Sequence, residues 1–146
     1  MKLSQFFKSI VDQDTSAVVV CDTAHTIVYM NPAACERYAK RGGGALVGKS
    51  LLDCHNSVSG ALIQKVLDWF QASRENNRVH TFFNEKENKD VYMIALRDER
   101  GELIGYYEKH EYRDRDTEPF YHFVWAEDDM NIGEQKEYTG CWKPKD

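Results

Sequence analysis

Two groups of β-prone segments on either side of a helical block constrain the fold of this chain more than any other feature. Residues 17–21 (AVVVC) are followed, after a short turn, by residues 26–30 (TIVYM), and both runs are rich in β-branched side chains. Three further segments, 79–83, 90–97 and 103–112, come later, with polar turns between them. Strands this close in sequence pair as antiparallel hairpins. We therefore expect one antiparallel sheet, built from an N-terminal pair and a C-terminal trio of strands.

The block between the two strand groups has helical spacing. The dipeptide Asn31-Pro32 suits the N-cap and the first position of a helix that we expect to end near Lys40. A short, partly helical connection is predicted over residues 46–54, and Ser59 is predicted to cap a longer helix that ends near Arg74. The apolar face of that longer helix is Leu62, Ile63, Val66, Leu67 and Phe70.

Runs of strands around a helical block predict an α+β fold, in which helices pack on one face of an antiparallel sheet. Near the N-terminus, an apolar stripe at helical spacing predicts an amphipathic helix before the sheet. The stripe is Leu3, Phe6, Phe7, Ile10 and Val11. We divide the chain into this flanking helix at 1–14, a central domain at 15–112 and a C-terminal extension at 113–146.

The order of these elements, together with three local patterns, resembles a PAS domain. The run AVVVCDTAHTIVYMNPAA is similar to the first two strands of that family and to the asparagine that opens its first helix. ALVGKSLLD resembles the glycine-centred approach to its long helix, and ALRDERGELIGYYE resembles its last hairpin. The likeness spans about residues 15–112. It implies a five-stranded antiparallel sheet, in the spatial order second, first, fifth, fourth, third, whose helices on one face can enclose a ligand.

The segment LLDCHNSVSG further resembles a subgroup of stand-alone bacterial PAS proteins with a Cys-His-Asn segment before the long helix. PAS domains are sensory and interaction modules of signalling proteins. The resemblance therefore implies a non-enzymatic sensor that binds a small molecule or a protein partner and passes on a conformational change. No kinase, cyclase or DNA-binding segment fits in the rest of the chain, so we expect the output to come from a signalling partner. The expected pocket wall is Tyr29, Cys54, His55, Leu62, Ile63, Val66, Tyr92, Ile94 and Tyr106.

The resemblance leaves the cofactor unknown and argues against haem and flavin. Haem-binding relatives place the axial histidine within the long helix, and residues 59–73 contain no histidine. Flavin-binding photosensory relatives need an Asn-Cys-Arg run, which is absent. In the yellow photoreceptor relatives a cysteine near the long helix carries the chromophore, but Cys54 lies closer to the preceding VGK than that pattern requires.

The Cys54-His55-Asn56 segment is the one cluster with obvious chemical potential. A thiol beside an imidazole becomes a reactive thiolate when the two groups meet, yet adjacent residues rarely point at each other. A turn in which Cys54 packs as a small apolar residue fits the same pattern. Two alternatives therefore stay open beside the ligand sensor. One is a thiol-based redox sensor or enzyme that uses Cys54 and His55, and the other is a purely structural interaction module with a filled core.

The apolar stripe of residues 1–14 has two interpretations that do not exclude each other. It covers the outer face of its own sheet, or it pairs with the same helix of a second chain. Large apolar patches are rare on soluble monomers, and PAS domains commonly dimerise through such a helix. We expect a homodimer in which Leu3, Phe6, Phe7, Ile10 and Val11 form the interface.

Charge and composition exclude several classes of protein. The chain has 19 basic and 24 acidic residues and a net charge of −5, which argues against non-specific nucleic-acid binding. No apolar run approaches the roughly 18–20 residues that span a bilayer, and the N-terminus is too polar for a secretory signal, so we expect a cytoplasmic protein with no membrane contact. The four cysteines form no CxxC pair, and the other histidines, His25, His80, His110 and His122, are dispersed, so we expect free thiols and no metal site.

The C-terminal extension differs from the rest of the chain. It carries a net charge of −4 and six aromatic residues, whereas a purely solvated acidic tail lacks aromatics. Thr117 and Pro119 suit the start of a helix with Phe120, Phe123 and Val124 on one face, and strand alternation fits nearly as well. The extension either folds back over its own sheet or docks on a partner.

Overall fold

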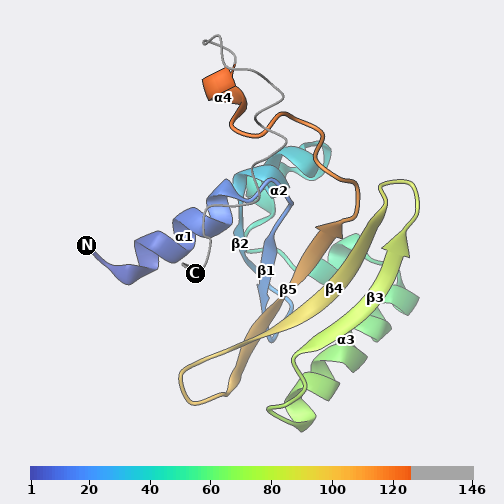
Figure 1. The fold of residues 1–146 in the computed structure, drawn as a ribbon. Coiled ribbons are helices and arrows are strands. Elements are labelled where there is room, and N and C mark those ends of the chain that lie inside the picture. Colours follow the sequence, from blue (N-terminus) through green and yellow to red (C-terminus); the bar gives the residue numbers. More distant parts are fainter. Residues whose placement is uncertain (126–146) are drawn as a thin grey trace, which may run out of the picture. The chain divides into compact units, whose positions relative to one another are not determined.

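The computed structural model describes residues 1–125 and contains a five-stranded antiparallel sheet with helices packed against one face (Figure 1). The strands are β1 (Val19–Asp22), β2 (Ile27–Met30), β3 (Arg78–Asn84), β4 (Lys89–Arg97) and β5 (Leu103–Tyr112). The helices are α1 (Leu3–Gln13), α2 (Pro32–Arg37), α3 (Ser57–Ala72) and α4 (His122–Trp125). The strand order is β2-β1-β5-β4-β3, which confirms the expected α+β fold and its order of strands.

The first hairpin joins the last strand at the centre of the sheet. β1 pairs with β2 on one side and with β5 on the other, so the N-terminal pair and the C-terminal trio form one layer. Opposite Asp22 the partner strand has Gly105, and a Cβ atom there would overlap the carbonyl oxygen of Cys21. Glycine is therefore required at this position for the two strands to approach each other.

The helical block begins where the sequence predicts. The side chain of Asn31 accepts a hydrogen bond from the amide of Ala34 at 2.9 Å, and Pro32 occupies the first helical position. α2 ends at Arg37 rather than near Lys40, because the chain continues there in short 3₁₀ helices. These are Ala39–Arg41, Gly43–Leu46 and Leu51–Cys54.

The prediction that Ser59 caps the long helix is wrong. Asn56 is the N-cap: its backbone is extended, and its side-chain oxygen accepts a hydrogen bond from the Ser59 amide at 2.8 Å. Asn56 and Ser59 are both good capping residues three positions apart, and the chain uses the earlier one. Ser59 consequently lies within the first turn of α3.

The core lies between the sheet and the helical block. Its buried members are Ala17, Cys21, Ile27, Met30, Ala34, Leu46, Leu67, Phe70, Met93 and Tyr106. On α3, Leu67 and Phe70 are buried and Ile63 and Val66 pack partly against this core. Leu62, however, is 57% exposed, so it does not belong to the buried face of the helix.

Asn31 connects several segments at the edge of this core. Its side chain is fully buried and accepts a hydrogen bond from Val18 at 2.8 Å as well as from α2. Its amide group donates to the carbonyl oxygens of Val11 at 3.0 Å and Ser16 at 2.9 Å. One side chain therefore ties the end of α1 to the start of α2 and to the segment that enters β1.

The described residues bear on three expectations, which concern free thiols, membrane-spanning helices and metal sites. Cys21, Cys35 and Cys54 are free thiols, and Cys141 lies outside residues 1–125. Among those same residues, no helix is long and apolar enough to cross a membrane, and no three His, Cys, Asp or Glu side chains cluster as metal ligands would.

The chain divides into two compact units, Met1–Arg113 and Asp114–Asp146. In the second unit, the described part contains α4, a single helical turn in which Phe123 is exposed. The structure has a helix in this segment rather than a strand, but the helix begins at His122, so Thr117 and Pro119 do not start it and Phe120 lies before it. Two of the six aromatic residues of the extension, Tyr138 and Trp142, lie outside the described residues.

Candidate functional site

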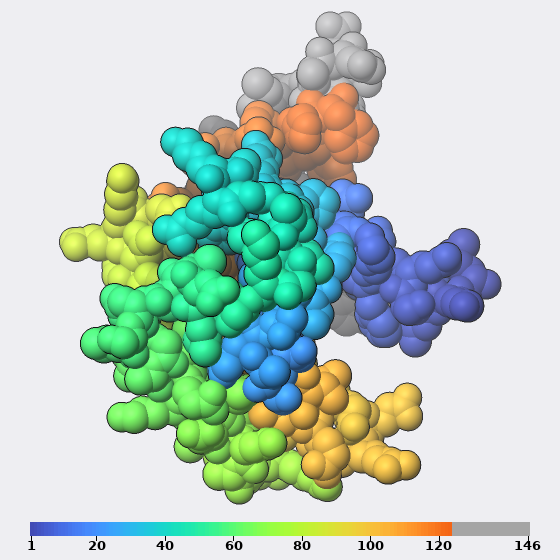
Figure 2. Space-filling view, turned by 180° about the vertical axis from the view of Figure 1, so that it is seen from behind, coloured from blue at the N-terminus to red at the C-terminus, as the bar shows by residue number. Residues whose placement is uncertain are grey.

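A cavity of about 490 Å³ lies between the sheet and the helical block. Figure 2 shows the face of the molecule on which α2, the 3₁₀ helices and α3 cover the sheet. The volume falls within the range of about 300–1,000 Å³ that is typical of small-molecule sites. One part of the wall is apolar: Ala17, Val19, Ile27, Met30, Leu46, Leu51, Ile63 and Met93.

The other part of the wall is polar, and β5 supplies much of it. Tyr106, Glu108 and His110 alternate along this strand, so all three side chains point to the face that the helices cover. The remaining polar lining residues come from α2, the 3₁₀ helices and the segment before α3: Arg37, Tyr38, Arg41, Cys54 and His55.

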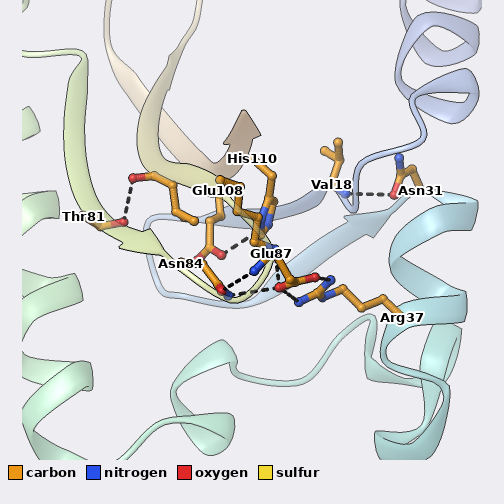
Figure 3. Close-up of polar contacts among 10 residues, drawn as sticks. Val18, Asn31, Arg37, Thr81, Asn84, Glu87, Glu108 and His110 are labelled. Carbon is orange, nitrogen blue, oxygen red and sulfur yellow. Dashed lines mark hydrogen bonds and ion pairs between the residues drawn. The ribbon is translucent and has the colours of Figure 1, made fainter. Parts of the chain in front are cut away.

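Glu108 and His110 lie next to each other on this wall. His110 Nε2 lies 3.3 Å from a carboxylate oxygen of Glu108, and the imidazole is only 5% exposed (Figure 3). Burial, and then the positive charges of Lys89 and Arg37, lower the pKa of His110 to about 4. The imidazole is therefore neutral at pH 7. Burial also raises the pKa of Glu108 above its ordinary value, because a carboxylate loses hydration in the wall.

Arg37 reaches from α2 to the β3–β4 turn, where its charge is neutralised (Figure 3). Its guanidinium donates to both carboxylate oxygens of Glu87, at 2.9 and 3.0 Å. The ammonium of Lys89, which is almost completely buried, lies 3.0 Å from the same carboxylate. The hydrogen bond from Arg37, followed by that from Lys89, lowers the pKa of Glu87 to about 2. Of these three residues, Arg37 lines the cavity.

Arg41 and His55 stand together on another part of the lining. Arg41 follows α2 in the first 3₁₀ helix, and within residues 1–125 its guanidinium has no carboxylate partner. Burial, and then the positive charge of Arg41, lower the pKa of His55, which is therefore neutral at pH 7. His55 Nδ1 lies 3.2 Å from the hydroxyl of Ser59.

Tyr106 connects the cavity wall to α3 through a chain of hydrogen bonds. Asp68 can only accept, so Gln64 donates its amide group to Asp68 at 2.9 Å and turns its oxygen to His25, 2.7 Å away. His25 Nε2 must then carry the proton, and His25 Nδ1 accepts from the hydroxyl of Tyr106 at 2.8 Å. His25 is a buried residue with a φ of 65° in the β1–β2 turn, so this dispersed histidine has a specific structural role.

Four of the predicted pocket residues line the cavity: Cys54, His55, Ile63 and Tyr106. Tyr92 and Ile94 do not, because they flank Met93 on β4 and therefore point to the opposite face of the sheet. There the guanidinium of Arg78 lies 4.0 Å from the centre of the Tyr92 ring.

Tyr29, Leu62 and Val66 also lie elsewhere. Tyr29 faces α1, with the ammonium of Lys8 5.6 Å from its ring centre. Leu62 is exposed to solvent, and Val66 packs against the core without lining the cavity. Both positions fit the apolar spacing of α3, but only part of the apolar face of this helix lines the cavity.

Sequence reasoning missed the charged part of the wall. The alternation that starts at Tyr106 would have placed Glu108 and His110 on the same face of β5. No comparable signal existed for Arg37 and Arg41, because their positions depend on the path of α2 and the 3₁₀ helices that follow it.

The thiol hypothesis receives no support from the geometry of the Cys54-His55 segment. Cys54 is exposed, and within the described part of the chain no hydrogen bond joins its thiol to the imidazole of His55. The imidazole meets Ser59 instead, so it does not act as the base that would activate the thiol.

Comparison with known proteins identifies relatives of this fold. A family model described as "PAS fold" matches residues 11–109. A C-terminal domain from Streptococcus mutans matches with a TM-score of 0.57 and 18% identity, over 82% of this chain and 89% of that one. The PAS domain of BvgS from Bordetella pertussis matches with a TM-score of 0.54 and 15% identity, over 92% and 96%.

A PAS domain from Colwellia psychrerythraea matches with a TM-score of 0.53 and 13% identity, over 75% of this chain and 96% of that one. At such identities the solved structures show a shared fold and nothing further. No curated protein matches the sequence significantly.

Proposed function

This chain belongs to the PAS-fold family, and from that premise we propose that it is a non-enzymatic sensor whose cavity binds a small organic molecule. Members of this family are typically sensory modules of signalling systems. The observation that carries the proposal is the cavity of about 490 Å³ with one apolar and one polar part of its wall. Such a lining combines apolar contact area with a few polar groups that orient a ligand. The same cavity argues against the alternative of a structural module with a filled core.

Two hydrogen-bonded links support transmission from the cavity to the surface. Tyr106 lines the cavity and reaches α3 through His25 and Gln64. Asn31 caps α2, which supplies Arg37 to the wall, and also holds the end of α1. A ligand that binds one arrangement of these links more tightly than another shifts the population between them. A cytoplasmic signalling protein that contacts α1 or α3 would read that shift.

Native mass spectrometry and an absorption spectrum of the freshly purified full chain test the proposal. We expect a bound small molecule in the wild-type protein and its loss in Ile63→Trp, because Ile63 lines the cavity and the larger indole fills it. Leu62→Trp is the matched control, since the neighbouring residue on α3 is exposed and outside the lining. A wild-type protein that carries nothing, and whose melting temperature responds to no compound in a metabolite library, contradicts the proposal. Equal ligand occupancy in the two variants also contradicts it.

We also propose that the protein self-associates through α1. Leu3, Phe6, Phe7 and Ile10 are more than half exposed, and α1 buries none of its residues. A helix whose apolar stripe is open to water is typical of an interface, and a second copy offers the same stripe. The other side of the helix is polar, with an ion pair between Lys8 and Asp12.

Analytical ultracentrifugation checks this interface. We expect a dimer for the wild-type chain and a monomer for Phe6→Glu. The substitution places a charge in the apolar stripe that dimer formation would bury. Gln5→Glu is the control, since it adds the same charge to an exposed polar position of the same helix. If Phe6→Glu sediments like the wild type, α1 is not the interface.

A further inference from the structure

We propose that the ligand of the cavity is an organic anion, a small carboxylic acid with an apolar body, whose carboxylate binds Arg41 beside His55. This inference rests on the proposed function, because it names the chemical class of the molecule that the cavity takes. It follows from the balance of charges around the cavity and from where the apolar part of the wall lies.

Where Arg37 lines the cavity, the basic groups already have acidic side chains beside them. Arg37 and Lys89 are the two cations there, and Glu87 and Glu108 are the two acidic residues. Arg37 uses two of its donors on Glu87 in a bidentate pair, which is the strongest ion-pair geometry available to arginine. Glu108 lies beside His110, and the positive charges of Lys89 and Arg37 act on its carboxyl group. Arg37 is therefore already paired within the protein.

Arg41 is the lining cation that the described residues leave without a counter-ion. Arg41 is an exposed residue of the cavity lining, and no carboxylate within residues 1–125 pairs with it. The two lining imidazoles do not change this balance, because His55 and His110 are both neutral at pH 7. A carboxylate in the ligand would supply the missing negative charge and accept a forked pair of hydrogen bonds from the guanidinium.

The rest of the wall accounts for the body of the ligand. Leu51 and Ile63 come from the helical block, and Ile27 and Met93 come from the facing sheet, so an apolar chain or ring is enclosed on both sides. Burial of apolar surface contributes roughly 25 cal/mol per Å², which makes the body the main source of affinity. The carboxylate then determines how the ligand is oriented and which chemical class of ligand binds. An amine of the same size would bring a second positive charge next to Arg41.

Isothermal calorimetry with three probes of equal chain length tests the charge preference. Octanoate, octan-1-ol and octylamine are titrated at about pH 7.5 into the full chain, freed of any co-purified molecule. We expect octanoate to bind at least about tenfold more tightly than octan-1-ol, and octylamine to bind most weakly. Arg41→Gln should abolish the preference for octanoate and leave the affinity for octan-1-ol unchanged. Arg100→Gln, in the exposed β4–β5 turn away from the lining, should bind all three as the wild type does.

The imidazole of His55 gives an independent readout by NMR titration. The charged and polar groups that the structure places against it are Arg41 and the hydroxyl of Ser59. A carboxylate bound at Arg41 offsets that positive charge, so octanoate should raise the pKa of His55. Octan-1-ol excludes water without adding charge, so it should leave the pKa of His55 unchanged or lower it.

The outcomes separate this inference from the proposed function. If octan-1-ol binds as tightly as octanoate, or if Arg41→Gln keeps the preference, the inference is overturned while the cavity remains a ligand site. If all three probes fail to bind a protein that does co-purify with a small molecule, the inference alone is overturned. If they fail to bind a protein that co-purifies with nothing and whose melting temperature responds to no compound in the metabolite library, the proposed function is overturned as well.

Discussion

Asn31→Asp tests the link between α1 and the cavity by changing one group. The substitution keeps the side-chain oxygen that accepts from Val18 and Ala34, and it replaces the amide group that donates to backbone carbonyls. Those acceptors are the oxygens of Val11, Asp14 and Ser16, at 3.0, 3.3 and 2.9 Å. In the variant, these oxygens face a second oxygen atom in a site with no exposure to water.

The expected loss follows from the cost of buried polar groups without partners. Removing one partner of a buried hydrogen bond costs about 1–3 kcal/mol, and here one group serves several carbonyls, so we expect a loss of about 3 kcal/mol at pH 8. Burial raises the pKa of the introduced carboxyl above the unfolded value of about 3.9, because the charged form is poorly solvated. The protonated carboxyl again has a donor. The free energy of unfolding that the variant loses relative to the wild type should therefore be smaller at low pH. This loss should grow as the pH rises through the folded-state pKa of the introduced carboxyl.

Urea denaturation followed by tryptophan fluorescence at pH 5 and pH 8 measures the effect. Hydrogen exchange should also show faster exchange of the α1 amides in the variant, because the end of that helix loses its anchor. Asn56→Asp is the matched control: Asn56 caps α3 only as an acceptor, at an exposed site, so a carboxylate there serves equally well. A loss below about 0.5 kcal/mol for Asn31→Asp at pH 8 would refute the reasoning, since it is smaller than one typical hydrogen bond. A larger loss at pH 5 than at pH 8 would refute it as well.

Three further predictions concern the polar wall and the centre of the sheet. The pKa of His110 is about 4 in the folded chain and about 6.5 unfolded. Between pH 7 and pH 5, the free energy of unfolding should therefore fall by about 2 kcal/mol more in the wild type than in His110→Gln. If urea denaturation shows the same fall in both proteins, this prediction is contradicted. Tyr106→Phe leaves the Nδ1 of His25 without its donor, and we expect a loss of about 1–3 kcal/mol in the same assay; an unchanged midpoint contradicts it. Gly105→Ala forces a Cβ into a carbonyl of β1 and should cost at least about 3 kcal/mol. Gly60→Ala, where the new Cβ would meet Leu52 at an ordinary contact distance of 3.8 Å in the first turns of α3, should stabilise by about 0.5–1 kcal/mol; thermal melts that rank the two in the opposite order contradict the packing argument.

Local chemistry made much of the fold predictable. The bounds of β5, Leu103–Tyr112, agree with the sequence prediction, because alternation and the flanking turns are properties of neighbouring residues. Asn31 was recognised as an N-cap from its own chemistry and the proline that follows. The error at Ser59 arose within the same logic, since Asn56 is an equally good cap and only the path of the preceding 3₁₀ helix decides between them.

The cavity was predictable only in part. Cys54 and His55 lie in it because the segment before the long helix borders the hollow, which the family resemblance implied. The faces of β4 could not be assigned, because Tyr92, Met93 and Ile94 are all large and apolar enough to be buried. Which of them faces inward depends on the pairing of β4 with β5 and on the position of α3.

By itself, the sequence determined the order of helices and strands, the antiparallel sheet and the apolar stripe of α1, since each depends on spacing over a few residues. Only the tertiary structure decided how the cavity is charged. Arg37 and Glu87 are 50 residues apart, and their bidentate pair forms because α2 and the β3–β4 turn meet at one end of the hollow. That contact neutralises Arg37 and leaves Arg41 as the lining cation without a partner within residues 1–125. Charge balance depends on distance in space, and a linear pattern of residues does not contain those distances.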